Sequence, residues 1–328
     1  MVNGYGLNKF LERPRQGQEL GRDRMLVYKA FWIFTLAVLL SFQGGQAQTA
    51  ASLRGDTLTV AFTGDILLDR GVRRQIESLG IGSLFDARTD SLFRCSDIVV
   101  GNLECPATAL STPMMKRFVF RAEPEWLEAL HAHGFTHLNL ANNHSVDQGR
   151  RGLVDTWRNV ERYGMTPVGA GGTMAEAARP VLLAKHPRKV WLLASLQLPL
   201  EHFPYLPERP SVNQETIDSM LVRIRALRGA DNSAVIIVSL HWGKEHTLEP
   251  EPIQRSIARR LIDAGADALV CHHTHTLQTI ERYRGKPIYY SLGNFIFDQH
   301  RDLNRRTCVP QLKITRDSIF VTDNLFTF

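Results

Sequence analysis

The chain has 328 residues, of which 44% are hydrophobic and 22% are charged. This composition is typical of a folded, enzyme-sized protein and excludes collagen-like, coiled-coil, disordered and polytopic membrane proteins. The net charge is +6, but half of this excess lies in residues 1–47. The rest of the chain is nearly balanced, so the charge predicts no polybasic surface and no nucleic-acid partner.

Residues 30–42 form an apolar run without charge, with basic residues before it and small, polar residues after it. This order is typical of an export signal, and residues 45–47 (Gly-Gln-Ala) suit signal cleavage. The run is shorter than the ~18 residues of a membrane span, which favours a cleaved signal peptide over an anchor. We therefore predict an exported, extracytoplasmic protein, secreted or anchored by this segment, with residues 48–328 as one domain. The polar stretch ahead of Met25 suggests that Met25 is the true start.

Beyond the leader, apolar runs of strand length alternate with helical patterns. The predicted strands are 57–63, 97–101, 135–141, 190–197, 234–241, 266–271 and 287–292, and the predicted helices are 124–132, 150–163, 214–228 and 252–264. Strands that are apolar throughout and separated by helices indicate an α/β domain with a sheet buried on both faces.

Towards the carboxyl end the pattern changes to hairpins. Segments 277–292 and 309–326 predict hairpins that turn near Arg284-Gly285 and Arg316-Asp317, so an antiparallel part joins the parallel part. Between Pro199 and Pro210, four prolines exclude a helix or central strand and predict a long loop, a common location for lids and binding residues.

Polar side chains follow each buried strand at its carboxyl end. They are Asp65, Glu104, Asn143, His144, Asp147, His241, Lys244, Glu245, His273, His275 and Asn294. One such residue is more often a turn former or helix cap than a ligand, but six successive strand ends make that explanation improbable. Because the carboxyl ends of parallel strands meet at one crevice, we expect these groups to converge.

Imidazole, carboxylate and amide groups suit divalent ions such as Zn, Mn or Fe. His273 and His275 are two residues apart, so in an extended segment they point to the same side. A centre of this kind supports hydrolysis without a Ser or Cys nucleophile. The four cysteines have no CxxC spacing, and either a Cys95–Cys105 disulfide or buried free thiols fits them.

The motifs FTGDILLDRG, GNLECP, NLANNHSVDQG, SLHWGKEH, HHTHTLQ and YYSLGNF, within about residues 57–300, resemble the bacterial capsule-synthesis CapA family. That family is associated with poly-γ-glutamate, and its domain is similar to the calcineurin-like metallophosphatases. The resemblance implies a two-sheet β-sandwich flanked by helices (α/β/β/α). It also implies one or two divalent metal ions, with Asp65, Glu104, Asn143, His241, His273 and His275 as ligands.

Two departures from the metallophosphatase pattern affect this ligand set. Leu67 stands where the phosphatases carry a histidine, and Glu104 replaces an aspartate. One metal is then weak, absent or completed by another residue, such as Glu245 or Asp147.

The remaining polar residues have expected roles as well. His144, with Asp147, is a candidate general acid, although a hydrogen bond that only holds the loop is an equal alternative. Arg121, Lys244, Glu245 and Asn294 are candidate substrate-binding residues. The resemblance implies a metal-dependent hydrolase-like protein acting on an anionic cell-envelope polymer such as poly-γ-glutamate, with membrane-embedded capsule synthesis proteins as possible partners. The alternative is a non-catalytic polymer-binding or export subunit on the same scaffold.

Overall fold

The computed structural model describes residues 56–299 and 301–327. The predicted leader 1–47, its boundary with the following domain and the suggested start at Met25 lie outside these ranges and stay predictions. Within the described ranges, no helix is long and apolar enough to cross a membrane. The prediction of an exported or membrane-anchored protein is therefore not borne out, since the described ranges contain no membrane-spanning helix.

The larger sheet is built around β1 (Thr57–Ile66). Its order is β15-β14-β1-β2-β3-β4, with β2 (Ile98–Leu103), β3 (His137–Asn139), β4 (Thr166–Val168), β14 (Arg306–Thr315) and β15 (Ile319–Thr327). Strands β1 to β4 are parallel, whereas β14 and β15 form an antiparallel hairpin on β1. Beside the carboxyl end of β1, strand β13 (Asn294–Ile296) takes the place of β14. This exchange brings Asn294 next to Asp65.

The second sheet has the order β11-β12-β10-β9-β7-β6. Its strands are β6 (Val181–Ala184), β7 (Val190–Leu196), β9 (Val235–His241), β10 (Ala268–Val270), β11 (Ile280–Tyr283) and β12 (Lys286–Tyr289). The central four are parallel and the two edge strands are antiparallel. A small separate pair joins β5 (Ala170–Gly171) to β8 (Ser211–Val212).

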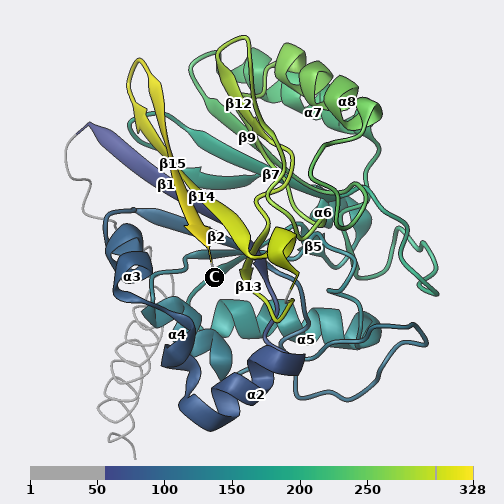
Figure 1. The fold of residues 1–328 in the computed structure, drawn as a ribbon. Helices are drawn as coiled ribbons and strands as arrows, with labels where there is room; N and C mark the ends of the chain where they lie inside the picture. Colours follow the sequence, from purple (N-terminus) through teal and green to yellow (C-terminus); the bar gives the residue numbers. More distant parts are fainter. Residues whose placement is uncertain (1–55, 300, 328) are drawn as a thin grey trace, which may run out of the picture. The chain divides into compact units, whose positions relative to one another are not determined.

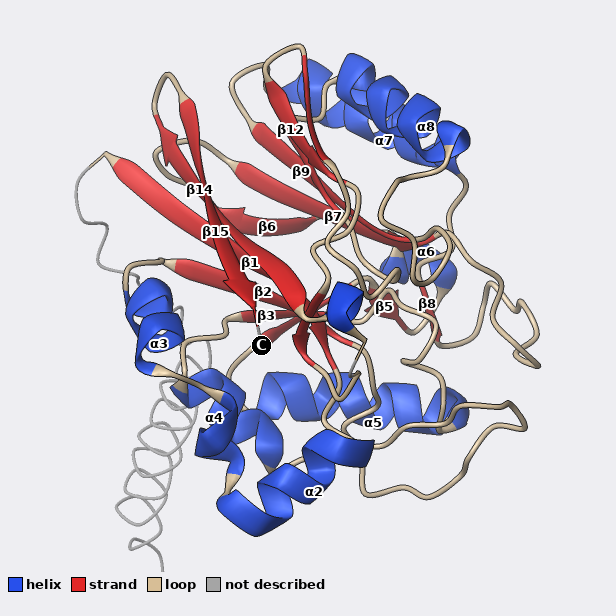
Figure 2. Ribbon diagram, in the orientation of Figure 1, coloured by secondary structure: helices blue, strands red, loops and turns tan. Residues whose placement is uncertain are grey.

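Helices cover the outer face of each sheet, which gives four layers (Figure 1). The larger sheet packs on α2 (Arg70–Leu79), α3 (Ala87–Arg94), α4 (Trp126–Ala132) and α5 (Gly149–Arg162), and the second packs on α7 (Ile217–Ala230) and α8 (Pro252–Ala264). The short elements are η1 (Ile81–Leu84), α6 (Met174–Ala177) and η2 (Asp302–Asn304). Figure 2 shows the two sheets facing each other between these helices. The predicted α/β class and the two-sheet sandwich flanked by helices are confirmed.

The strands are apolar throughout because both of their faces are buried. In β1, Val60 and Phe62 point into the core between the sheets, while Ala61 between them packs towards the helices. In β9, Ile237 belongs to the core between the sheets, and the next residue, Val238, packs on α7 and α8. Alternate side chains therefore fill two different cores.

Several elements differ from the sequence prediction. Helices α2 and α3 and the β6–β7 hairpin are absent from that prediction. Helix α2 gives a weak helical pattern because it buries only Val72 and Ile76, while its other large apolar residue, Leu79, is exposed. The proline-rich segment 199–210 is a loop, as predicted, and Phe203 anchors it in a small apolar cluster. No disulfide forms among the described cysteines, because Cys95 is exposed and Cys105 is buried.

Gly64 is required where β1 meets β13. A Cβ on Gly64 would lie 2.0 Å from the carbonyl oxygen of Gly293, which also accepts a hydrogen bond from the Asp65 amide. Gly64→Ala is therefore expected to push the two strands apart and to lower the free energy of unfolding by about 3 kcal/mol. Denaturant unfolding measures this loss. Gly82→Ala, with nothing within 4 Å of the added carbon, is the matched control, and equal stability of the two variants would contradict the packing argument.

Candidate metal centre

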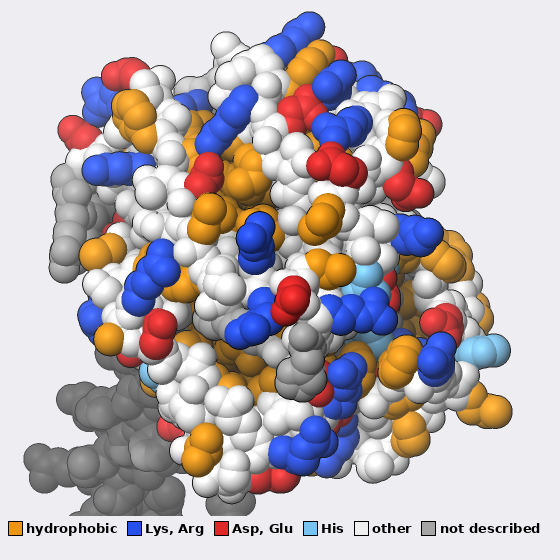
Figure 3. Space-filling model, in the orientation of Figure 1, with side chains coloured by type: hydrophobic (Ala, Val, Ile, Leu, Met, Phe, Trp, Pro, Cys, Tyr) orange, Lys and Arg blue, Asp and Glu red, His pale blue; other side chains and the backbone are white. Residues whose placement is uncertain are grey.

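The strand-end residues converge at one edge of the sandwich. Asp65 is the second-last residue of β1, Glu104 follows β2, Asn143 and His144 follow β3, and His241 is the last residue of β9. His273 and His275 follow β10, and Asn294 begins β13. Asp65, Glu104 and His241 have no exposed surface. In Figure 3, histidine side chains lie in a recess of the surface with Lys and Arg side chains beside it.

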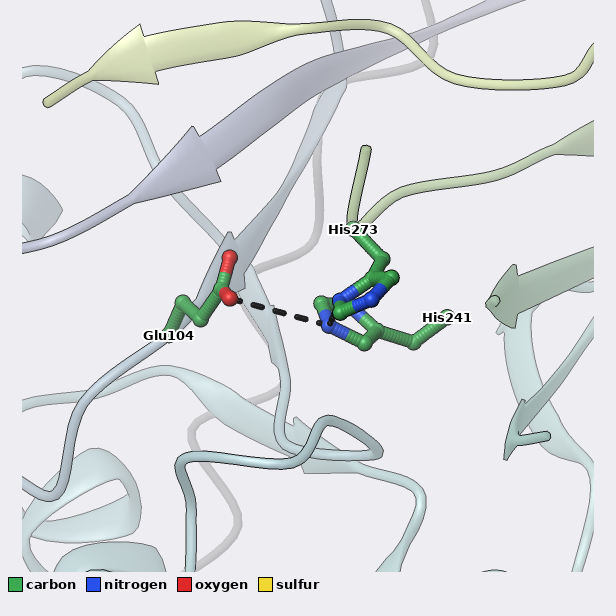
Figure 4. Close-up of side chains that lie close together, drawn as sticks. All are labelled: Glu104, His241 and His273. Carbon is green, nitrogen blue, oxygen red and sulfur yellow. Dashed lines mark hydrogen bonds and ion pairs between the residues drawn. The ribbon is translucent and has the colours of Figure 1, made fainter. Parts of the chain in front are cut away.

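Two groups of potential ligands share one carboxylate, that of Glu104. The first group is Glu104, His241 and His273, and the second is Asp65, Glu104 and His275. The Glu104 Oε1 atom lies 3.6 Å from His241 Nε2 and 3.8 Å from His275 Nε2. Figure 4 shows the Glu104 carboxylate and the two imidazoles of the first group pointing towards one another. Glu104 is thus placed to bridge two ions.

The first group has a fourth candidate ligand. Asn143 Oδ1 lies 2.8 Å from His241 Nε2, which in turn lies 3.1 Å from His273 Nδ1. In the second group, His275 Nδ1 lies 3.3 Å from Asp65 Oδ2 and 3.0 Å from Asn294 Oδ1. Leu67 stands where the metallophosphatase pattern carries a histidine ligand. Its side chain is fully buried among apolar residues. The two groups therefore differ in their donors, because the first has two imidazoles and the second has one.

The Glu104 carboxylate is buried with neither oxygen hydrogen-bonded within the described part of the chain. Burial raises the pKa of Glu104 well above its ordinary value, and the negative charge of Asp65 adds to this. A buried carboxylate without partners is costly, and a divalent cation relieves that cost. The donor set and its burial fit a divalent metal such as Zn, Mn or Fe.

Two histidines of the centre, His241 and His273, are held in the neutral form that binds metals. Burial lowers the pKa of His241 well below its ordinary value and that of His273 to about 3, and the neighbouring imidazoles act in the same direction. Burial alone would raise the pKa of Asp65, but the hydrogen bond and charge of His275 lower it. Asp65 is therefore a carboxylate, and His241 and His273 are neutral imidazoles that each keep a lone pair.

These shifts predict that the metal-free protein loses stability as the pH falls from about 6.5 to about 5. The pKa values of His241, His272 and His273 are lowered by burial, so below pH 6.5 the unfolded chain binds protons that the folded chain does not. Each histidine contributes a slope of up to about 1.4 kcal/mol per pH unit. Glu104 opposes them, because a raised carboxyl pKa favours folding at lower pH. Denaturant unfolding in EDTA measures the slope, and His273→Gln should make it smaller. An unchanged slope in that variant would contradict the assignment.

The backbone that carries the paired histidines is strained. His273 and His275 have φ values of 99° and 56°, in the left-handed region that non-glycine residues rarely occupy. These two residues therefore do not lie on an extended strand as predicted, although both imidazoles still reach Glu104. Strain of this kind persists where the surroundings fix it, and it is common at functional sites.

Asn102, the second residue of the GNLECP motif, supports the centre, a role that its motif alone did not predict. Its amide donates a hydrogen bond to Asp65 Oδ1 at 2.8 Å and lies 3.4 Å from His241 Nδ1. Its carbonyl accepts hydrogen bonds from Asn139 and Asn142. These buried amides tie β1, β2 and the turn after β3 together. The sequence does hold a sign of this role, because Asn102 lies at the end of a buried strand, two residues before Glu104.

His144 lies beside both groups, and Asp147 orients it. His144 Nδ1 lies 2.9 Å from Asp147 Oδ2, which also accepts a hydrogen bond from the Phe120 amide. Asp147 Oδ1 is paired with Lys116 Nζ at 2.5 Å. Asp147 thus faces Lys116 and His144 and belongs to neither ligand group, and completion of the second group by Asp147 or Glu245 stays a prediction. A role for His144 as general acid stays a prediction.

The candidate substrate-binding residues lie in different surroundings. Arg121 forms a two-point ion pair with Glu123 and donates to the Thr108 carbonyl, so its guanidinium is occupied within the fold. Lys244 and Glu245 are exposed on the loop after β9. Asn294 contacts His275 within the centre. Substrate binding by these four residues stays a prediction.

The four-layer sandwich, with carboxylates and imidazoles gathered at its strand ends, defines an α/β/β/α protein with a candidate metal centre. The family model described as bacterial capsule synthesis protein PGA_cap matches residues 59–299. The chain therefore belongs to the PGA_cap family of bacterial capsule synthesis proteins, as its motifs led us to expect.

Two curated relatives span most of this chain. The PGA biosynthesis protein CapA of Bacillus subtilis is 32% identical over 306 residues, which are 92% of this chain and 80% of the relative. The capsule biosynthesis protein CapA of Bacillus anthracis is 32% identical over 82% of this chain and 66% of its own length. Among solved structures, the sulfate thiohydrolase SoxB of Thermus thermophilus aligns with 83% of this chain and 57% of its own, at a TM-score of 0.48 and 12% identity. A likeness at this level carries no argument about chemistry.

Proposed function

We propose that this protein is a metal-dependent hydrolase-like protein that acts on an anionic polymer such as poly-γ-glutamate during capsule biosynthesis. The observation that carries the proposal is the Glu104 carboxylate, which is buried, has no hydrogen bond from any described residue and is shared by two ligand groups. The names of the relatives support the polymer, because both are proteins of PGA or capsule biosynthesis. Partners other than the polymer stay a prediction.

The residues present can support hydrolysis. Asp65, Glu104, Asn143, His241, His273 and His275 would hold one or two ions. Bound ions of this kind polarise an acyl or phosphoryl oxygen and lower the pKa of water. His144 is held through Nδ1 by Asp147, which leaves Nε2 to exchange a proton with a leaving group. Lys244, exposed on the loop after His241, provides a positive charge for an anionic chain.

The experiment is a hydrolysis assay of the purified full chain. Poly-γ-glutamate and simple phosphate esters are incubated with added Mn, Zn or Fe, and product release is compared with that of Asp65→Ala. We expect turnover that requires metal and that falls at least about 100-fold in the variant. Turnover that survives both chelation and Asp65→Ala would contradict the proposal.

A second candidate is a non-catalytic polymer-binding subunit on the same scaffold. Its support is Leu67, which is buried in the apolar core and stands where the metallophosphatase pattern carries a histidine ligand. Binding of labelled poly-γ-glutamate that is unaffected by EDTA, without turnover, would favour this candidate. Binding that is lost on chelation, together with turnover, favours the enzyme.

A further inference from the structure

Lys116 is a buried lysine in the irregular segment between β2 and α4. Its side chain is only 5% exposed, and its Nζ lies 2.5 Å from Asp147 Oδ1. The same ammonium donates a hydrogen bond to the backbone carbonyl of Asn143 at 3.0 Å. Its neighbours Met115 and Arg117 are exposed, so the chain turns this one residue inward.

The two partners of Lys116 belong to the centre in different ways. Asn143 is a candidate ligand of the first group, and Asp147 holds the Nδ1 side of the His144 ring. The same segment also contributes Phe120, whose ring centroid lies 4.4 Å from that of His144 and whose amide donates to Asp147. Lys116 is thus the cationic end of a buried chain of contacts that reaches both His144 and Asn143.

Burying an ammonium and a carboxylate together rarely adds stability, because the loss of hydration offsets the attraction. Such a pair instead fixes the orientation of its side chains, because a buried charge needs its partner in one particular position. Without Lys116, Asp147 would be a fully buried carboxylate without a cation, and the Asn143 carbonyl would lose its donor.

We propose that Lys116 is a positioning residue of the metal centre, which fixes the Asn143–His144 turn through Asp147 and the Asn143 carbonyl. This proposal rests on the proposed function, because it assigns Lys116 to the same centre. Lys116 acts through these two residues and is neither a ligand nor a proton donor. The segment from residue 107 to 121 is thereby linked to the centre through the polar contacts of Lys116 with Asp147 and Asn143.

The test compares Lys116→Met with the unsubstituted protein by two measurements that need no turnover. The first is the dissociation constant of Mn²⁺ or Zn²⁺, which we expect to rise about tenfold while the number of ions at saturation stays the same. The second is the ¹⁵N spectrum of histidine-labelled protein, in which we expect the His144 Nδ1 signal, assigned with His144→Gln, to shift. Arg117→Met is the matched control, because Arg117 lies over Phe118 at the surface.

A rescue experiment tells whether the Lys116 variants lose the positioning ammonium or are damaged more generally in their fold. Lys116→Cys is made in a Cys95→Ser background, since Cys95 is the exposed cysteine among those described and the other three are shielded. Alkylation with 2-bromoethylamine then restores an ammonium at nearly the lysine length. We expect the His144 signal and the metal affinity to return to the unsubstituted values. Lys116→Gln, which keeps a donor without the charge, replaces Lys116→Met if that variant does not fold.

An unchanged His144 signal and metal affinity in a folded Lys116 variant would overturn the proposal. So would failure of the alkylated protein to recover either value. Neither result depends on hydrolysis, so a protein that binds metal but shows no turnover would refute the proposed enzyme and leave this test intact.

Discussion

Glu104→Gln is expected to make the metal-free protein more stable and to abolish its stabilisation by divalent metal. The carboxylate of Glu104 is buried, accepts no hydrogen bond within residues 56–299 and 301–327, and lies close to the charged Asp65. A neutral amide of the same shape removes this repulsion and should gain about 1–3 kcal/mol, or a few degrees in melting temperature. In the unsubstituted protein, saturating metal should raise the melting temperature, because metal binds only the folded state.

Differential scanning calorimetry with EDTA and with excess Mn²⁺ or Zn²⁺ measures both effects. Glu249→Gln is the control, because Glu249 is an exposed carboxylate paired with Arg255. The control should respond to metal as the unsubstituted protein does. A Glu104→Gln protein that is less stable without metal, or that still gains stability from it, would show that Glu104 is an ordinary structural carboxylate.

His273→Ala and His275→Ala are expected to have unequal effects on metal binding. His273 belongs to the group that also contains His241 and the Asn143 oxygen, whereas His275 belongs to the group with Asp65. Because the first group has two imidazoles and the second only one, His273→Ala should remove the tighter ion, with a loss in affinity of about 100-fold or more. His275→Ala should leave that ion and remove the weaker one. The double variant should bind neither.

Isothermal titration calorimetry with Mn²⁺ or Zn²⁺ gives the number and affinity of the ions. His246→Ala is the control, since its ring lies 6.1 Å from that of His275 and outside both groups. Equal affinities in the two single variants would mean that the two groups do not form distinct sites. A loss with His246→Ala as large as with His275→Ala would make His246 a ligand of the second ion.

The candidate centre was largely predictable because its residues lie at strand ends. An apolar run marks a buried strand, and the next polar residue then marks the edge at which parallel strands meet. Asp65, Glu104, His241, His273 and His275 were found in this way, and all five belong to the two ligand groups. The rule needs only local sequence, so it works without knowledge of strand order.

Lys116 and the helix α2 were not predictable by the same means. Lys116 lies in an irregular segment among exposed residues, and only the folded chain shows that it turns inward to Asp147. Helix α2 buries two residues, too few for a clear helical period. The left-handed backbone at His273 and His275 was also missed, since it is imposed by the surroundings of the loop. In each case tertiary contacts decided the local structure.

Metal analysis of the purified protein tests the central claim most directly. The unsubstituted chain and Glu104→Gln are equilibrated with Mn²⁺ or Zn²⁺, freed of loose ions by gel filtration and analysed by mass spectrometry of the elements. We expect one to two ions per chain in the unsubstituted protein and none in Glu104→Gln, because both ligand groups depend on Glu104. Equal metal contents in the two proteins, or no metal in either, would contradict the account.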